Sequence, residues 1–177
     1  MIKMHSAPDE YEVEIQNDNK IVANWLLWIN ERKINYILRW DEILNSENHE
    51  LQLAVSSNRS GTSDPAGAKG IKLADLQEVE RWIKLIAEVE EKLPWRKKIF
   101  LQLRREYRFS SGWNGWTAAV QYRYAHRITE ILNVKPEEVW VDNRRTFSIW
   151  WNEIVDYTVR LVCKRGLLIE KNNEKAS

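Results

Sequence analysis

The side chains of this 177-residue chain best suited to chemistry are the arginines and lysines between Pro94 and Glu130. That stretch holds 8 Lys and Arg against 2 Asp and Glu, a net charge of +6. Residues 1–93 hold 11 Lys and Arg against 17 Asp and Glu, a net charge of −6, so the overall +1 conceals a polarised molecule. Cationic side chains attract phosphates through long-range electrostatics. The basic segment favours a phosphate-bearing partner; the alternative is that its cations only solvate helix faces.

Two clusters of cationic side chains in this segment are the candidates for phosphate contacts. The first cluster lies in "RREYR", residues 104–108. The second lies in "YRYAHR", residues 122–127, where two tyrosine hydroxyls alternate with cations, a mixture that suits contact with a nucleic-acid backbone. In the alternative, the tyrosines pack in the core and only the arginines are exposed. The predicted phosphate contacts are Arg104, Arg105, Arg108, Arg123, His126 and Arg127.

The stretch "ITEILNVKPEEVW", residues 128–140, has the spacing of a helix-turn-helix. That motif needs a small residue in its first helix, a residue that tolerates positive φ four positions later, and an aliphatic residue six positions after that. Thr129, Asn133 and Val139 stand at these spacings, and Asn is a non-glycine residue enriched at positive φ. The expected apolar flanks are Ile128, Leu132 and Val134.

The segment after the turn has the sequence of a helix start. Pro136 suits the first helical position, and Glu137 and Glu138 suit the positive end of the helix dipole. Two residues depart from the motif, because Thr129 replaces the usual Ala or Gly and Asp142 stands where a second aliphatic residue is expected. An ordinary helical corner with good capping therefore remains the alternative to a helix-turn-helix.

A recognition helix presents its first two turns to base edges. Arg144 and Arg145 suit bidentate pairing with guanine, and the two glutamates either accept from cytosine or serve only as helix-start charges. The predicted base-edge contacts are Lys135, Glu137, Glu138, Val141, Arg144 and Arg145.

Apolar residues recur at helical intervals through most of the chain, which predicts an all-α fold. The loop "SSNRSGTSDPAGAKG", residues 56–70, divides the chain into two parts. Residues 1–62 are expected to be an acidic arm with an amphipathic helix for oligomerisation, and residues 63–177 a helix-turn-helix domain. The expected fold is a helical bundle with a C-terminal helix-turn-helix and a separate N-terminal amphipathic helix. The expected helices cover about residues 19–46, 65–93, 94–109, 116–132 and 136–165.

Several function classes receive no support from the sequence. No Gly-rich phosphate loop, paired carboxylates with a base, or Cys/His cluster is present, so we expect no enzyme, no cofactor and no metal site. Cys163 lies at helical spacing and is expected to be a buried or half-buried structural residue. With no signal peptide or membrane-spanning run, we expect a cytoplasmic protein without a membrane partner. Ten tryptophans indicate self-association.

The stretch "LPWRKKIFLQLRREYRF" followed by "ITEILNVKPEEVW" resembles the fourth region of bacterial sigma factors, although the connecting helix is longer here. The same layout, together with "SDPAGAKGIKL" at residues 63–73, resembles phage late-operon activators of the ArpU and RinA type. The resemblance covers about residues 63–160. It implies a phage or prophage regulator that binds double-stranded DNA and has RNA polymerase as a further partner.

Three non-enzymatic functions follow from these patterns. The first is a sequence-specific DNA-binding transcriptional regulator, expected to form a homodimer or a higher homo-oligomer. The second is a phage small terminase subunit, which would also be all-α and oligomeric. The third is a protein-interaction module whose basic segment binds an acidic partner. Target sequence and activation versus repression are not encoded in any of these patterns.

Overall fold

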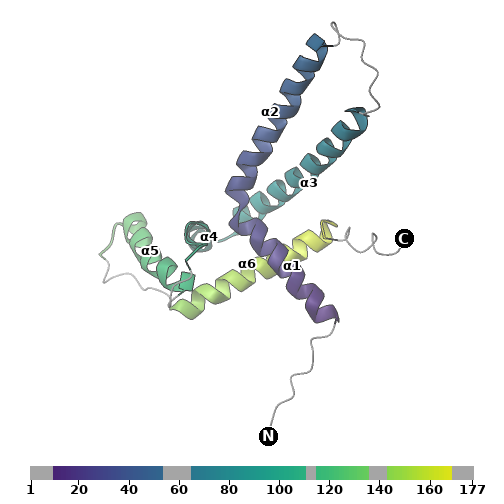
Figure 1. Cartoon of the computed structure of the whole chain (residues 1–177). Helices are drawn as coiled ribbons and strands as arrows, with labels where there is room; N and C mark the ends of the chain where they lie inside the picture. Colours follow the sequence, from purple (N-terminus) through teal and green to yellow (C-terminus); the bar gives the residue numbers. More distant parts are fainter. Residues whose placement is uncertain (1–9, 54–64, 111–114, 136–142, 169–177) are drawn as a thin grey trace. The chain divides into compact units, whose positions relative to one another are not determined.

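The computed structural model describes residues 10–53, 65–110, 115–135 and 143–168, and these residues form helices without a strand (Figure 1). The all-α prediction is confirmed. No helix in the described ranges is both long and apolar enough to cross a lipid bilayer. The helices are α1 (Glu10–Leu27), α2 (Ile29–Leu53), α3 (Pro65–Lys92), α4 (Trp95–Glu106), α5 (Gly115–Leu132) and α6 (Arg144–Lys164).

The first expected helix is two helices, and both extend beyond the predicted range. The apolar spacing predicted one helix over about residues 19–46, but a bend at Trp28 separates α1 from α2. Helical structure begins at Glu10, inside the segment expected to be a frayed arm. Sequence periodicity missed the bend because apolar residues continue at helical spacing on both sides of Trp28.

The helix starts at Pro65 and Pro94 agree with the prediction. α3 begins at Pro65, where a missing N–H costs the helix nothing. Pro94 ends α3 and stands as the N-cap of α4, with its carbonyl accepting from the Lys98 amide at 3.0 Å. Both helix starts therefore follow from the restricted φ of proline and its absent donor.

The chain forms two compact units, Met1–Leu27 with Glu88–Ser177, and Trp28–Ala87. The boundaries of these units differ from those of the predicted domains. α1 belongs to the same unit as the C-terminal helices, and most of α3 belongs to the same unit as α2. The functional division at residues 62/63 stays a prediction.

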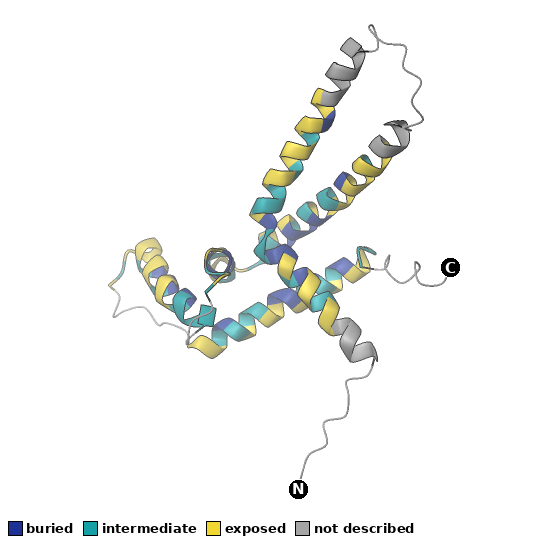
Figure 2. Cartoon of the chain, in the orientation of Figure 1, coloured by how far each residue is buried: buried dark blue, intermediate teal, exposed yellow. Residues whose placement is uncertain are grey.

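The first unit is built around α4, which packs against α1, α5 and α6. Its core contains an aromatic cluster in which the Phe100 and Phe147 rings stack with centroids 5.6 Å apart. The Tyr124 and Phe147 rings form a T-shaped pair with centroids 5.2 Å apart, and the Trp150 and Phe100 rings form another with centroids 5.8 Å apart. Aromatic pairs at such separations add to the stabilisation from buried area. Figure 2 shows these helices with buried faces inward and exposed faces outward.

The second unit contains α2 and most of α3, with Ile29, Ile43, Leu76 and Trp82 among its buried side chains. One side of α2 carries four exposed apolar side chains. Ile34, Ile37, Leu38 and Leu44 are each more than half exposed; Ile37 and Leu38 follow Ile34 by three and four residues, and Leu44 follows Ile37 by seven. An exposed apolar stripe of this kind is typical of an interaction surface, and its partner stays a prediction.

Cys163 near the end of α6 is exposed, so the expected buried or half-buried position was wrong. The buried face of α6 is formed by Phe147, Ile154, Thr158 and Val162. Cys163 follows Val162 directly, and one helical step of about 100° turns its side chain away from that face.

Candidate functional site

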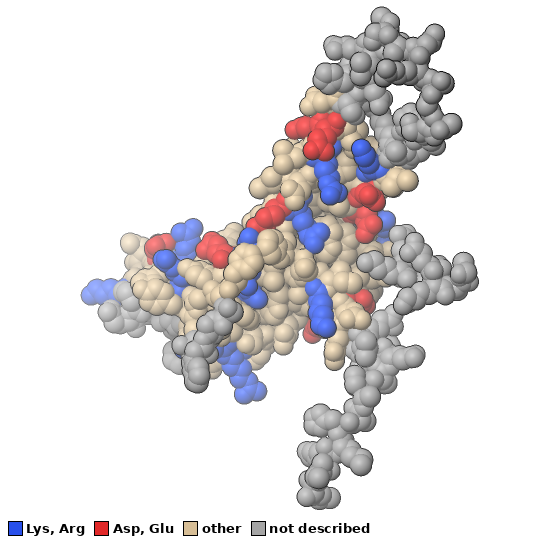
Figure 3. All heavy atoms as spheres, in the orientation of Figure 1, with Lys and Arg blue, Asp and Glu red and all other residues tan. Residues whose placement is uncertain are grey.

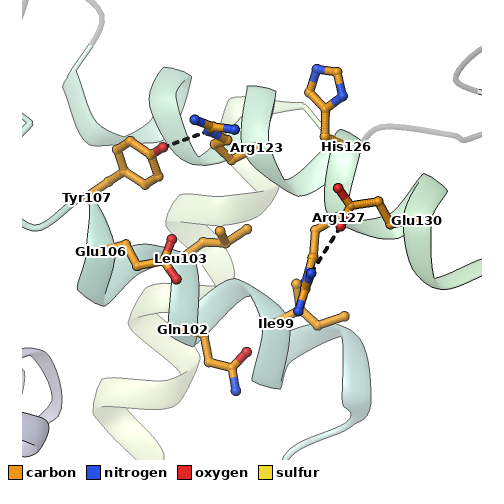
Figure 4. Close-up of a pocket in the computed structure, with 9 residues that line it drawn as sticks. All are labelled: Ile99, Gln102, Leu103, Glu106, Tyr107, Arg123, His126, Arg127 and Glu130. Atoms are coloured by element: carbon orange, nitrogen blue, oxygen red, sulfur yellow. Dashed lines mark hydrogen bonds and ion pairs between the residues drawn. The ribbon is translucent and has the colours of Figure 1, made fainter.

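A groove between α4 and α5 holds three of the six predicted phosphate contacts. Its volume is about 360 Å³, and its floor contains the aliphatic side chains of Ile99 and Leu103. Figure 4 shows the walls formed by α4 on one side and α5 on the other. The polar side chains that line it are Gln102, Glu106, Tyr107, Arg123, His126, Arg127 and Glu130.

Arg123 is held in the groove by a neutral partner. Its Nε donates to the Tyr107 hydroxyl at 2.8 Å, a contact drawn in Figure 4. This hydrogen bond and the electrostatic attraction of the same side chain raise the pKa of Arg123 above its usual value. Arg123 is exposed, so its guanidinium is oriented yet remains accessible to an anion.

Arg127 lies one turn later on α5 and carries its own counter-ion. Its Nη1 is 3.0 Å from Glu130 Oε2, and both side chains are more than half exposed. In Figure 4 the Arg127 side chain reaches toward Ile99 of α4, while the His126 ring projects away from α4. His126 instead meets the Tyr122 ring edge to face, with centroids 4.6 Å apart. The two arginines and His126 thus follow one exposed edge of α5.

The prediction of phosphate contacts at Arg104 and Arg105 was wrong, because both side chains are buried in the first unit. Arg105 donates from Nε to the Leu26 carbonyl of α1 at 2.8 Å and from Nη2 to Glu90 Oε1 at 2.6 Å. A guanidinium fixed by a carbonyl and a carboxylate, and only 7% exposed, is a structural tie between helices.

Arg104 is held by aromatic rings. Its guanidinium carbon lies 4.3 Å from the ring centre of Trp116 and 5.2 Å from that of Trp151. Both distances are within the range of a cation–π interaction. Burial lowers the pKa of Arg104 to about 10, so the group remains cationic at neutral pH.

Arg108 is half-buried, and it too has a structural contact. Its Nη1 donates to the Arg105 carbonyl at 3.0 Å, near the end of α4, and its guanidinium lies 5.0 Å from the ring centre of Phe109. Cations that bond the last carbonyls of a helix stabilise its negative end. Arg108 therefore caps α4, and its predicted phosphate contact stays a prediction.

The turn after α5 has the conformation that the helix-turn-helix prediction requires. Asn133 has φ of +52°, which confirms the predicted left-handed residue. The Val134 amide donates to the Thr129 carbonyl at 3.3 Å, the six-to-one bond of a Schellman motif. Ile128 is buried as predicted, but Leu132 is 46% exposed, because the buried stripe of α5 stops one turn earlier.

The segment beyond this turn differs from the predicted continuous helix 136–165. Asn143 has extended dihedrals and caps α6, accepting at Oδ1 from the Thr146 amide at 3.0 Å. Arg144 and Arg145 consequently lie in the first turn of α6, both exposed, and Lys135 is exposed after α5. The remaining predicted base-edge residues, Glu137, Glu138 and Val141, lie outside the described residues, as do Pro136, Val139 and Asp142.

A second groove of about 410 Å³ lies on another face of α5. Its lining includes Ala118, Ala125, Thr129 and Tyr122, with Arg144 of α6 at its border. The Arg144 Nε lies 3.4 Å from Gln121 Oε1. The first turn of α6 is therefore beside the middle of α5, which brings Arg144 to the same helix as the phosphate candidates.

Four polar residues of the groove were not among the predicted contacts: Gln102, Glu106, Tyr107 and Glu130. Tyr107 directly follows α4 and contacts Arg123 of α5, so local spacing carries no sign of this pair. Glu130 was predictable, because it stands three residues after Arg127, a spacing that places opposite charges side by side on a helix.

Among the described residues, no group of three or more His, Cys, Asp or Glu side chains has a metal-binding arrangement. The chain matches no protein-family model, no curated protein and no solved structure.

Proposed function

We propose that this chain is a sequence-specific regulator of transcription that binds double-stranded DNA, of the phage late-operon type that its sequence resembles. The observation that carries the proposal is the exposed edge of α5, where Arg123, His126 and Arg127 line one groove. Arg123 is oriented by Tyr107 without losing its charge to an acid. Oriented, exposed guanidinium groups are the usual partners of phosphate oxygens.

The position of this edge within the fold supports DNA as the phosphate-bearing partner. α5 is followed directly by the left-handed Asn133, the conformation that a helix-turn-helix requires at its turn. Arg144 and Arg145, the two arginines proposed to contact guanine, are exposed at the start of α6. In this proposal α5 contacts the backbone and sets the register, and the arginines after the turn discriminate bases.

The proposal is tested by measuring the affinity of the purified full chain for duplex DNA at several salt concentrations. Removing two phosphate contacts with Arg123→Ala and Arg127→Ala should weaken binding and reduce the slope of log affinity against log salt by about two. The matched control removes two exposed cations from the second unit, Arg39→Ala with Lys72→Ala, and should leave the slope unchanged. A flat salt response of the unaltered protein would reject the proposal.

Sequence specificity needs its own measurement. Selection from a random duplex library should enrich one motif with the unaltered protein, and Arg144→Ala with Arg145→Ala should relax that motif at one or two positions. Each lost bidentate guanine contact removes about 1–3 kcal/mol of discrimination. If no motif is enriched, a protein-interaction module is favoured over a regulator.

A phage small terminase subunit is the second candidate. The observation that favours it is the exposed stripe of Ile34, Ile37, Leu38 and Leu44 on α2, which suits an oligomerising helix. Measurement of the mass of the assembly in solution separates the two functions. A ring of many copies supports the terminase, whereas a dimer supports the regulator.

A further inference from the structure

The groove between α4 and α5 is balanced in charge. Two arginines, Arg123 and Arg127, line it together with two glutamates, Glu106 and Glu130. Figure 3 shows red and blue side chains next to one another over α4 and α5 on the face shown, and Glu106 and Glu130 are the only acidic residues in the sequences of these two helices. A surface built only to attract polyanions would carry cations without nearby acids. The acids of this groove therefore need a function of their own.

The two arginines have different partners. Arg123 contacts a phenolic hydroxyl, which orients the guanidinium without forming an ion pair with it. Arg127 contacts the carboxylate of Glu130 at 3.0 Å. Because both members of this pair are more than half exposed, the pair is of the weak, solvent-screened kind that another anion can displace.

We propose that Glu130 competes with DNA phosphate for Arg127, so that the groove holds one open phosphate site, at Arg123, and one site closed by its own carboxylate. The inference rests on the proposed function and adds a regulatory property to the same site. Binding at Arg127 requires the guanidinium to exchange Glu130 for a phosphate oxygen. Non-specific DNA, which offers only backbone contacts, is held more weakly as a result.

Glu106 provides an internal comparison for this competition. It lines the groove from α4, on the wall that faces the arginines of α5 (Figure 4). Its carboxylate attracts Arg123 electrostatically, whereas Glu130 is in direct contact with Arg127. Removal of the Glu106 charge should therefore strengthen DNA binding less than removal of the Glu130 charge.

The test uses the full chain and a fluorescent duplex of random sequence, with affinity measured by anisotropy at several sodium chloride concentrations. Glu130→Gln should bind about two- to fivefold more tightly, the gain expected from releasing a surface ion pair. The salt slope should stay nearly unchanged, because Arg127 neutralises one phosphate in both proteins and only the exchange with Glu130 is lost. The matched control is Glu80→Gln, which breaks the exposed Glu80–Lys84 pair of the second unit and should leave binding unchanged.

A double-mutant cycle identifies the partner of Glu130. In an Arg127→Ala background, Glu130→Gln should no longer strengthen binding, since the competition has been removed. A gain that persists without Arg127, or an equal gain from Glu80→Gln, would overturn the inference in favour of a general charge effect. If Arg123→Ala with Arg127→Ala weakens binding but Glu130→Gln changes nothing, the proposed function stands and the competition alone is rejected. Absence of salt-dependent binding by the unaltered protein would reject both.

Discussion

The arginines of α4 and those of α5 belong to the same basic segment, yet the fold uses them in opposite ways. Arg104 and Arg105 are at most 8% exposed and contact tryptophans, a carbonyl and a carboxylate inside the first unit. Arg123 and Arg127 are exposed on the wall of a groove. Identical side chains twenty residues apart thus serve stability in one helix and are available for binding in the other.

The difference follows from the number of helices that surround each one. α4 packs against α1, α5 and α6, so most of its circumference faces other helices. An arginine on the packed side of such a helix is buried, and a buried guanidinium needs partners. α5 leaves one side open, and the cations on that side stay in water. The net charge of a segment therefore overestimates the number of cations available for binding when part of the segment is a central helix.

The sharpest test of the structural role is Arg105→Ala. The change leaves the Glu90 carboxylate and the Leu26 carbonyl without their donor in a largely buried position. Because Glu90 is about a third exposed, water compensates part of the loss, and we expect the free energy of unfolding to fall by about 2–4 kcal/mol. Urea denaturation measures it, and Arg105→Lys should give an intermediate loss. A change below about 0.5 kcal/mol, typical of surface residues, would contradict the comparison.

Arg104→Ala should have the next largest effect and lower the free energy of unfolding by about 1–3 kcal/mol. The change removes both the cation–π contacts and the packing between Trp116 and Trp151. Arg104→Met keeps an unbranched apolar side chain there and should recover most of the loss. Equal losses in the two variants would show that charge, and not packing, dominates at this position.

The pH dependence of these variants has a defined sign. Burial lowers the pKa of Arg104 to about 10, well below its ordinary value, so at pH values between these two the unfolded state binds more protons than the folded state. Stability contributed by this group therefore rises as the pH increases through 10. The difference in unfolding free energy between the unaltered protein and Arg104→Met should grow between pH 8 and pH 11. Other titrating groups are common to both proteins and largely cancel.

The sequence predicted the fold class, and it predicted the helix boundaries well where proline or a left-handed asparagine sets the backbone. Pro65, Pro94 and Asn133 each act through a local conformational preference, and all three stand at the positions expected. The predictions that failed depend on contacts between distant residues. Burial of Arg105 is set by Leu26, 79 positions away, and the Tyr107 partner of Arg123 lies on another helix.

For the same reason, the sequence predicted the part of the candidate site that lies on α5 but not the part that lies on α4. Residue type and spacing on α5 identified Arg123, His126 and Arg127, since an exposed helix keeps its own pattern. The pattern of α4 identified cations but not their surroundings. Apolar spacing predicted an inner side of Ile99, Leu103 and Tyr107; Leu103 is buried, Ile99 and Tyr107 are half-buried, and Phe100 and Leu101 are buried beside them.

The smallest expected effect is the most informative for function. Arg123→Ala with Arg127→Ala should leave the thermal unfolding midpoint unchanged, because both side chains are exposed and their partners can be hydrated when the contacts are lost. Differential scanning calorimetry of this variant beside Arg104→Ala provides the comparison in one measurement. If the α5 variant unfolds at a temperature as low as the α4 variant, its arginines are also structural. Weaker DNA binding by that variant would then report damaged folding, and only a variant with an unchanged midpoint can establish phosphate contact.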